Sequence, residues 1–428
     1  MVYQRALTLS ASAVMVRDMR TIGVEVDPAE AGFDPHRLAR LDRHLARYVD
    51  DGWLAGWQLL VARRGAVLHH STCGQRDREA GLPVKPDTIW RVYSMTKPVT
   101  SVAAMMLYED GLLQLRDPVS RYIPSFAGCR VYVRGPSTGP VTVPVTEPVR
   151  IWHLLTHTSG LTYGFHRAHL VDALYREAGY EFFPPHGVDL AAACDAWAAL
   201  PLLFQPGTEW NYGVSTDVLG RVVEVVSGMP LDRFFAERIL GPVGMVDTAF
   251  SVSEEQAHRL ARLYAASAPG RPPTRQDAYP PDLRDPTFLS GGGGLVSTAA
   301  DYHRLTRLLL GGGELDGVRL LSSRTVDFMT RNHLPGGRDL AELGRPFSAE
   351  PAFEGIGFGL GFSVVLDPVR NESLASAGEF FWGGLASTLF WVDPVERVTV
   401  VFLTQLIPSS TYPIRFELRQ LVNSSLVD

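Results

Sequence analysis

Ser94 and Lys97 lie three residues apart in the segment RVYSMTKPVT, at the predicted start of a helix. Residues three apart on a helix share a face, so the Lys97 amine can lie beside the Ser94 hydroxyl. The free amides at a helix N-terminus stabilise negative charge where an oxyanion would develop. The spacing therefore predicts a serine nucleophile, Ser94, activated by a lysine general base, Lys97.

Lysine is scarce in this chain, and this scarcity supports the prediction that Lys97 is the general base. Of the 40 basic residues only Lys85 and Lys97 are lysines, and the others are arginines. A general base must release its proton, which a desolvated lysine can do and an arginine cannot. Pro98 supports a helix start at this place, because proline is tolerated in a first turn. Lys97 is therefore predicted to be required for chemistry, whereas Lys85 lies in a predicted loop and is interpreted as a solvated surface charge.

The elements that must position these residues follow from the hydrophobic pattern. Asp34 and Pro35 predict a helix start, followed by leucines at helical spacing. Two strands are predicted on either side of Arg64-Gly65, as a hairpin. The pattern from 87 to 284 is mostly helical, with Pro- and Gly-rich loops at 134–148 and 266–286. Further strands are predicted at 359–366, 385–392 and 398–406, and a closing helix at 413–422.

This order of elements predicts an α+β fold, with an antiparallel sheet flanked by helices and a mostly helical inserted domain. The sheet-containing domain is expected to be discontinuous, made from residues 1–88 and 285–428. Residues 89–284 are expected to form the helical domain, with the active site between the two.

Composition excludes several classes of protein. The chain has 428 residues, 46% of them hydrophobic, and a net charge of −6 without long charge runs, so no nucleic-acid partner is expected. The three cysteines are far apart and lack a C-x-x-C, which argues against disulfides and zinc. His153 and His157 lie four apart but lack the glutamate of H-E-x-x-H, so no metal is expected, and His157 is interpreted as a residue that orders its loop. No G-x-G-x-x-G fingerprint and no G-x-S-x-G elbow is found, so no dinucleotide or other cofactor is expected.

The N-terminal segment leaves two interpretations. Residues 6–16 are weakly apolar and faintly like a signal peptide, but serines and a threonine dilute them and a second positive residue is missing in front. A mobile N-terminus on a cytoplasmic protein is the preferred interpretation. No apolar run approaches the ~20 residues that a membrane span needs.

Several stretches, in the expected order, resemble the serine β-lactamase and penicillin-binding-protein superfamily, in its class C-like branch and especially the family VIII carboxylesterases. The resemblance covers roughly residues 30 to 405. The stretches are the SMTK helix with the segment after it, IWHLLTHTSGL, PGTEWNYGVSTDVLGRVVEVVSGMPLDRFF and GGGGLVSTAADYHRL.

The resemblance implies two further motifs. Tyr212, in NYGVS, matches the tyrosine that shares proton transfer with the lysine, while Val214 replaces the asparagine of the lactamase Y-x-N. Trp382-Gly383-Gly384 takes the place of the lactamase K-T-G. Trp382 is expected to line the cleft, and the glycines to let substrate approach closely. The backbone amides of Ser94 and Leu385 are expected to form the oxyanion hole.

The predicted function is a serine hydrolase that cleaves small carboxylic esters through an acyl-enzyme on Ser94. An acyltransferase like the related statin-pathway enzymes is the first alternative, because it needs the same residues. A β-lactamase or D-amino-acid peptidase is the second, and a non-enzymatic penicillin sensor the third. The expected partner is a small-molecule ester. The sequence leaves the natural ester and the oligomeric state open.

Overall fold

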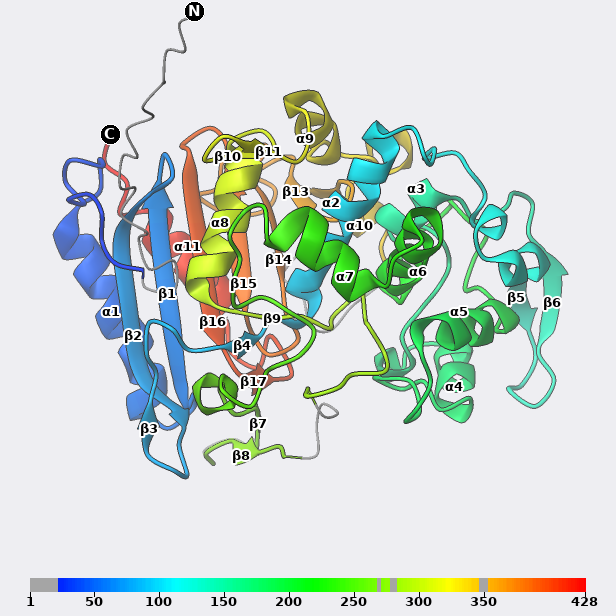
Figure 1. Ribbon diagram of the computed structural model, residues 1–428, viewed down its shortest axis with the longest axis horizontal. Helices are drawn as coiled ribbons and strands as arrows, with labels where there is room; N and C mark the ends of the chain where they lie inside the picture. Colours follow the sequence, from blue (N-terminus) through cyan, green and yellow to red (C-terminus); the bar gives the residue numbers. More distant parts are fainter. Residues whose placement is uncertain (1–21, 268–270, 278–282, 346–352) are drawn as a thin grey trace, which may run out of the picture.

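The central feature of the computed structural model is an eight-stranded antiparallel sheet (Figure 1). The structure describes residues 22–267, 271–277, 283–345 and 353–428, so the predicted signal-like segment lies outside the described residues. The strand order is β12-β13-β14-β15-β16-β1-β2-β3. The strands are β1 (Gly56–Arg63), β2 (Ala66–Asp77), β3 (Leu82–Pro83), β12 (Ile356–Phe358), β13 (Ser363–Val365), β14 (Phe380–Gly383), β15 (Leu389–Asp393) and β16 (Val398–Thr404).

The sheet joins the two ends of the chain. Strand β1 pairs with β2 on one side and with β16 on the other, so that Leu60 lies opposite both His70 and Val401. The predicted hairpin is confirmed: Arg64 and Gly65 form its turn with φ values of 53° and 84°. Every residue of β1 is buried, which requires cover on both faces of the sheet. The strands of this sheet all lie within 1–88 and 285–428, while the predicted domain division stays a prediction.

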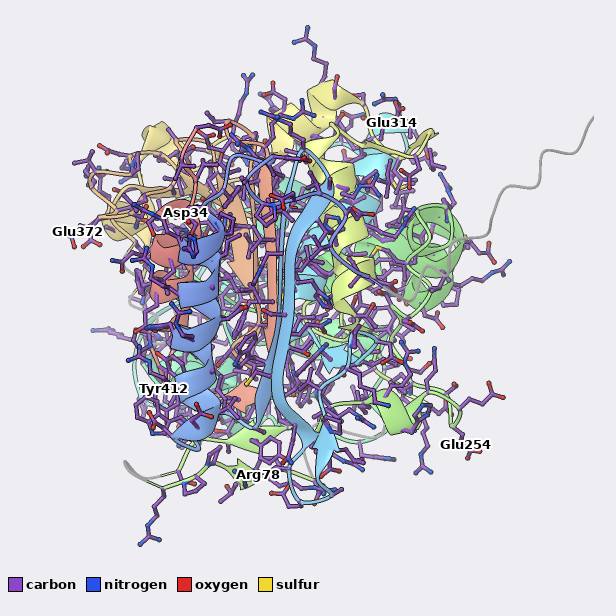
Figure 2. The ribbon with its side chains drawn as sticks, turned by 90° about the vertical axis from the view of Figure 1, so that its left-hand side faces the viewer. Asp34, Arg78, Glu254, Glu314, Glu372 and Tyr412 are labelled. Carbon is purple, nitrogen blue, oxygen red and sulfur yellow. The ribbon has the colours of Figure 1, made fainter. Side chains whose placement is uncertain are left out.

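One face of the sheet is covered by α1 (Pro35–Asp50) and α11 (Ile414–Asn423), shown in blue and red in Figure 2. Asp34, labelled at the upper end of α1, caps it by accepting hydrogen bonds from the amides of His36 and Arg37. The opposite face is covered by α8 (Ala299–Leu310), which packs against β1, β15 and β16. The α+β fold with helices on both faces is therefore confirmed.

The helical part lies beyond α8 (Figure 1). Its central helix is α2 (Thr96–Glu109), whose residues from Thr96 to Leu107 are all buried. Its other helices are α3 (Ile151–Leu155), α4 (Leu170–Glu177), α5 (Leu190–Ala199), α6 (Ser215–Ser227) and α7 (Leu231–Phe235). A helix that is buried on all sides belongs inside a domain, and α2 packs against α6 and α7.

One predicted loop is wrong. Residues 134–148 were expected to be irregular, but β5 (Arg130–Arg134) and β6 (Val141–Pro144) form a hairpin in which Val131 pairs with Val143. Alternating valines on either side of the Pro-Gly turn supply the strand pattern. The remaining short elements are β4 (Trp90–Arg91), β7 (Tyr264–Ala265), β8 (Thr274–Arg275), β9 (Val296–Ser297), β10 (Glu314–Leu315), β11 (Val318–Arg319), α9 (Ser323–Met329), α10 (Leu340–Leu343) and β17 (Leu406–Ile407).

Within the described ranges, none of the helices is both long and apolar enough to cross a lipid bilayer.

Candidate active site

Ser94 lies in a tight turn that leads directly into α2. Residues Tyr93–Met95 form a 3₁₀ turn, α2 begins at Thr96, and Pro98 falls in its first turn as predicted. Tyr93 has a φ of 45°, a left-handed conformation that is unfavourable for an aromatic residue. Such backbone strain is typical of functional sites. The turn leaves Ser94 partly exposed, in the lining of a cavity.

Lys97 is buried directly beside Ser94. Its side chain is 1% exposed, and its Nζ lies 3.1 Å from Ser94 Oγ. The same Nζ donates to the carbonyl oxygen of Gly292 at 2.8 Å and lies 3.2 Å from the hydroxyl of Tyr163. A carbonyl can only accept, so a neutral amine that donates to Gly292 and Tyr163 keeps its lone pair for the Ser94 proton. The arrangement is suited to a general base.

Tyr212 contacts Lys97 through its ring. The residue precedes α6, and Lys97 Nζ lies 4.4 Å from the centroid of its ring. The Tyr212 hydroxyl accepts a hydrogen bond from the indole N–H of Trp382 at 3.3 Å. The structure therefore brings Ser94, Lys97 and Tyr212 together, as the sequence predicts.

A second tyrosine, Tyr163, was missed by the sequence analysis. Its ring lies 5.4 Å from that of Tyr212, and burial raises the pKa of its phenol well above the ordinary value. Tyr163 follows the HTSG segment by a few residues, and this proximity to a motif is the signal that could have pointed to it. Tyr163 therefore places a phenol hydroxyl within hydrogen-bond distance of the Lys97 amine.

The cavity beside Ser94 is strongly aromatic. It encloses about 90 Å³, and it shares Tyr93, Phe183 and Ser290 with a neighbouring cavity of about 310 Å³. Among the described residues that line the smaller cavity, the aromatic ones are Tyr93, Tyr163, Phe165, Tyr180, Phe182, Phe183, Trp197, Tyr212 and Phe288. The same lining contains one carboxyl side chain, Asp217, and no arginine or lysine. The cavity is thus suited to an uncharged, apolar group.

The predicted Trp382-Gly383-Gly384 motif lies only partly in the cavity. Gly383, Gly384, Leu385 and Val214 are among the residues that line it. The Trp382 side chain is not among them, contrary to the prediction that it lines the cleft. It is 1% exposed, and its ring packs between those of Tyr212 and Phe358, at centroid distances of 5.2 and 5.5 Å. Trp382 therefore contacts Tyr212 rather than the cavity.

The two glycines also have a packing role, beside the predicted role in substrate approach. A Cβ on Gly383 would lie 2.4 Å from the guanidinium of Arg415, and one on Gly384 would lie 2.4 Å from the Val92 carbonyl oxygen. The space beside each Cα is therefore filled by the protein itself. Glycine at 384 lets the chain approach Val92, two residues before Ser94, and glycine at 383 leaves room for the Arg415 guanidinium.

His157 is a buried, uncharged neighbour of this site. It is 1% exposed, and its ring packs against those of Tyr212, Trp210 and Phe358. Burial, followed by the charge of Lys97, lowers its pKa well below the ordinary value. A neutral imidazole packed among aromatic rings is consistent with the structural role expected for it. In the described part of the chain, no cluster of histidine, cysteine and carboxylate side chains could hold a metal ion.

Comparisons with known proteins show the family to which the chain belongs. The family model described as "Beta-lactamase" matches residues 41–423. Protein Rv1367c of Mycobacterium tuberculosis is 39% identical, over 84% of this chain and 88% of its own. Esterase EstB of Burkholderia gladioli is 31% identical, over 89% and 93%. The solved structure of EstCE1, a hydrolase with promiscuous acyltransferase activity, superposes with a TM-score of 0.75 at 26% identity, over 92% of this chain and 99% of that one.

Proposed function

Because this chain belongs to the β-lactamase family and has esterase relatives close to the family VIII carboxylesterases, we propose that it is a serine esterase that cleaves small carboxylic esters. The observation that carries the proposal is the position of the Lys97 amine, 3.1 Å from Ser94 Oγ and beside an aromatic cavity that no arginine or lysine lines among the described residues.

In the proposed reaction, Ser94 Oγ attacks the ester carbonyl and its proton passes to Lys97. The carbonyl π electrons move to oxygen and form a tetrahedral oxyanion. The backbone amides of Ser94 and Leu385 are proposed to stabilise it, since both residues line the same cavity. Collapse of the oxyanion breaks the bond to the alcohol oxygen, which receives the proton from Lys97 through the Tyr212 hydroxyl. The acyl group then remains on Ser94 as an ester.

Deacylation repeats these steps with water as the nucleophile. Lys97 and Tyr212 accept a proton from water, and hydroxide adds to the acyl carbon. The bond to Ser94 Oγ then breaks as the proton returns to that oxygen. The products are a carboxylic acid and free enzyme, so every proton taken up is given back.

An acyltransferase is the second candidate function. It is favoured by the similarity to EstCE1, which is described as a hydrolase with promiscuous acyltransferase activity. The two functions differ only in whether water or an alcohol attacks the acyl-enzyme. The measurement that separates them is the ratio of acid to new ester when rising concentrations of an alcohol are added to one ester substrate.

The substrate preference is tested by comparing an ester with a β-lactam. We expect kcat/KM for p-nitrophenyl butyrate to exceed that for a chromogenic cephalosporin by roughly ten- to a hundredfold. A cephalosporin carries a carboxylate, and a charge-assisted hydrogen bond to such a group contributes about 1.5–3 kcal/mol. The cavity lining offers Asp217 and no arginine or lysine among the described residues, so this anion would be disfavoured. An equal or higher value for the cephalosporin would replace the esterase proposal by a lactamase.

The two tyrosines are tested by removing each hydroxyl. Tyr212→Phe is expected to lower kcat by about 10²-fold or more, the range for loss of a proton-transfer group. Tyr163→Phe, which removes a hydrogen-bond partner of Lys97 and keeps the ring, is expected to cost about tenfold. Both kcat values are measured on p-nitrophenyl butyrate, with KM as a check on binding. If Tyr163→Phe causes the larger loss, Tyr163 takes over the proton-transfer role and the assignment of Tyr212 is wrong.

A further inference from the structure

We propose that Asp217 is a positioning residue for the base: its buried carboxylate holds the Gly292 peptide that orients the Lys97 amine, and its charge stabilises the ammonium formed when Lys97 takes the Ser94 proton. This inference rests on the proposed function, because it assumes that Lys97 is the base.

Asp217 lies in the first turn of α6 and faces the cavity that contains Ser94. It is 3% exposed and lines this cavity together with Ser290 and Gly292. Its Oδ1 accepts hydrogen bonds from the Ser290 hydroxyl and from the Gly292 backbone amide, the latter at 3.0 Å. The carboxylate therefore anchors the glycine-rich segment that precedes β9.

The Gly292 peptide contacts both Asp217 and Lys97. Its N–H donates to Asp217, and its carbonyl oxygen accepts from Lys97 Nζ at 2.8 Å. A Cβ at position 292 would lie 2.5 Å from Asp217 Oδ2, so the close approach requires glycine. Helix α6 also packs directly against α2, which carries Lys97. Asp217 thus restrains Lys97 through a single residue, Gly292. It does so from α6, the helix that packs against α2.

The charges around Lys97 also support a role for Asp217 in stabilising its ammonium form. Among the described residues, the titratable groups that interact with Asp217 or Lys97 include Tyr163, Tyr212, His157 and Cys194 of α5. Burial raises the pKa of Asp217, whereas the Lys97 charge, the Ser290 hydroxyl and the Gly292 amide lower it. The Lys97 charge and these two hydrogen bonds favour the ionised form of Asp217. Its charge therefore compensates an ammonium at Lys97.

The decisive variant is Asp217→Asn, which keeps the shape and removes the charge. We expect kcat for p-nitrophenyl butyrate to fall about 10²-fold with KM nearly unchanged. Without the anion, the Lys97 ammonium is less stable and loses its proton at a lower pH. The acidic limb of the kcat–pH profile should therefore move to lower pH, by about one unit. A purely structural residue would lower kcat at every pH without moving this limb.

Asp301→Asn is the matched control. Asp301 is also a buried carboxylate, 0% exposed, that accepts from a hydroxyl, on Thr248, and from a backbone amide, that of Asp247. It is not among the residues that line the cavity. Asp301→Asn is expected to leave the acidic limb in place. An acidic limb that is unmoved in Asp217→Asn, or that moves equally in Asp301→Asn, would overturn the inference.

A second variant tests the positioning step without removing a charge. Ser290→Ala deletes the hydroxyl bond to Asp217 and should lower kcat about tenfold, with the acidic limb at the wild-type pH. Unchanged kcat would contradict the positioning role, even if Asp217→Asn failed to fold. Failure of the proposed function looks different: Lys97→Arg would then keep activity, whereas failure of this inference alone leaves Lys97→Arg inactive.

Discussion

Replacing Ser94 with alanine is expected to reduce hydrolysis of p-nitrophenyl butyrate to the uncatalysed background. Loss of a serine nucleophile removes the acyl-enzyme route altogether and can cost on the order of 10⁶-fold in kcat. The fold should persist, because Ser94 is partly exposed in a turn and its hydroxyl contributes little to packing. A serine-reactive phosphonate with a reporter group should label the wild-type chain once, and peptide mapping should place the label on Ser94.

Ser101→Ala is the matched control for this variant. Ser101 lies on the same helix, α2, is fully buried, and its hydroxyl has no hydrogen-bond partner among the described residues. Removal of this hydroxyl should leave kcat within about twofold of wild type, because the substitution breaks no hydrogen bond of the described structure. Full activity in Ser94→Ala, or a label on another serine, would disprove the nucleophile assignment.

Lys97→Arg is expected to be nearly as damaging as Lys97→Ala, with kcat lowered by about 10³-fold or more. Arginine keeps the positive charge but cannot act as a base near neutral pH, so the substitution separates proton transfer from electrostatics. Because Lys97 is 1% exposed, thermal unfolding of each variant should be recorded to show that the larger side chain is accommodated. The acyl-enzyme should also fail to accumulate in single-turnover measurements.

Lys85→Arg provides the matched control, since Lys85 is the other lysine of the chain and is exposed in a loop. It should be indistinguishable from wild type in kcat and in thermal stability. Activity of Lys97→Arg within about tenfold of wild type, equivalent to ~1.4 kcal/mol of barrier, would mean that Lys97 is not the base.

Much of the local structure around the site could be predicted from sequence. Asp34 and Pro35 begin α1, and Pro98 places Lys97 in the first turn of α2. Arg64-Gly65 forms the hairpin turn. Each of these features depends on residues within about four positions of one another, where backbone preference and capping decide the conformation. The contact between Ser94 and Lys97 is also local, because residues three apart along a helical turn lie on the same face.

Other features were mispredicted or missed because a sequence does not show in which direction a side chain points in the fold. Trp382 was expected in the cleft, but its ring fills the space behind Tyr212. Tyr163 and Asp217 were missed because neither lies in a recognisable spacing with Ser94. The alternation of valines in β5 and β6 was visible in the sequence, but the Pro- and Gly-rich turn between them obscured it.

The sequence by itself determined the helix that places Lys97 beside Ser94 and the family to which the chain belongs, and from it came the proposed nucleophile and base. Only the tertiary structure decided which groups complete the environment of Lys97. Its contacts with Tyr163 and Gly292 join residues 66 and 195 positions apart, and the bond between Trp382 and Tyr212 spans 170. Contacts over such separations depend on how the central helix α2, α6 and the sheet pack together. No local rule encodes that packing, because burial of apolar surface is non-directional and the directions of the polar groups emerge only once the core is closed.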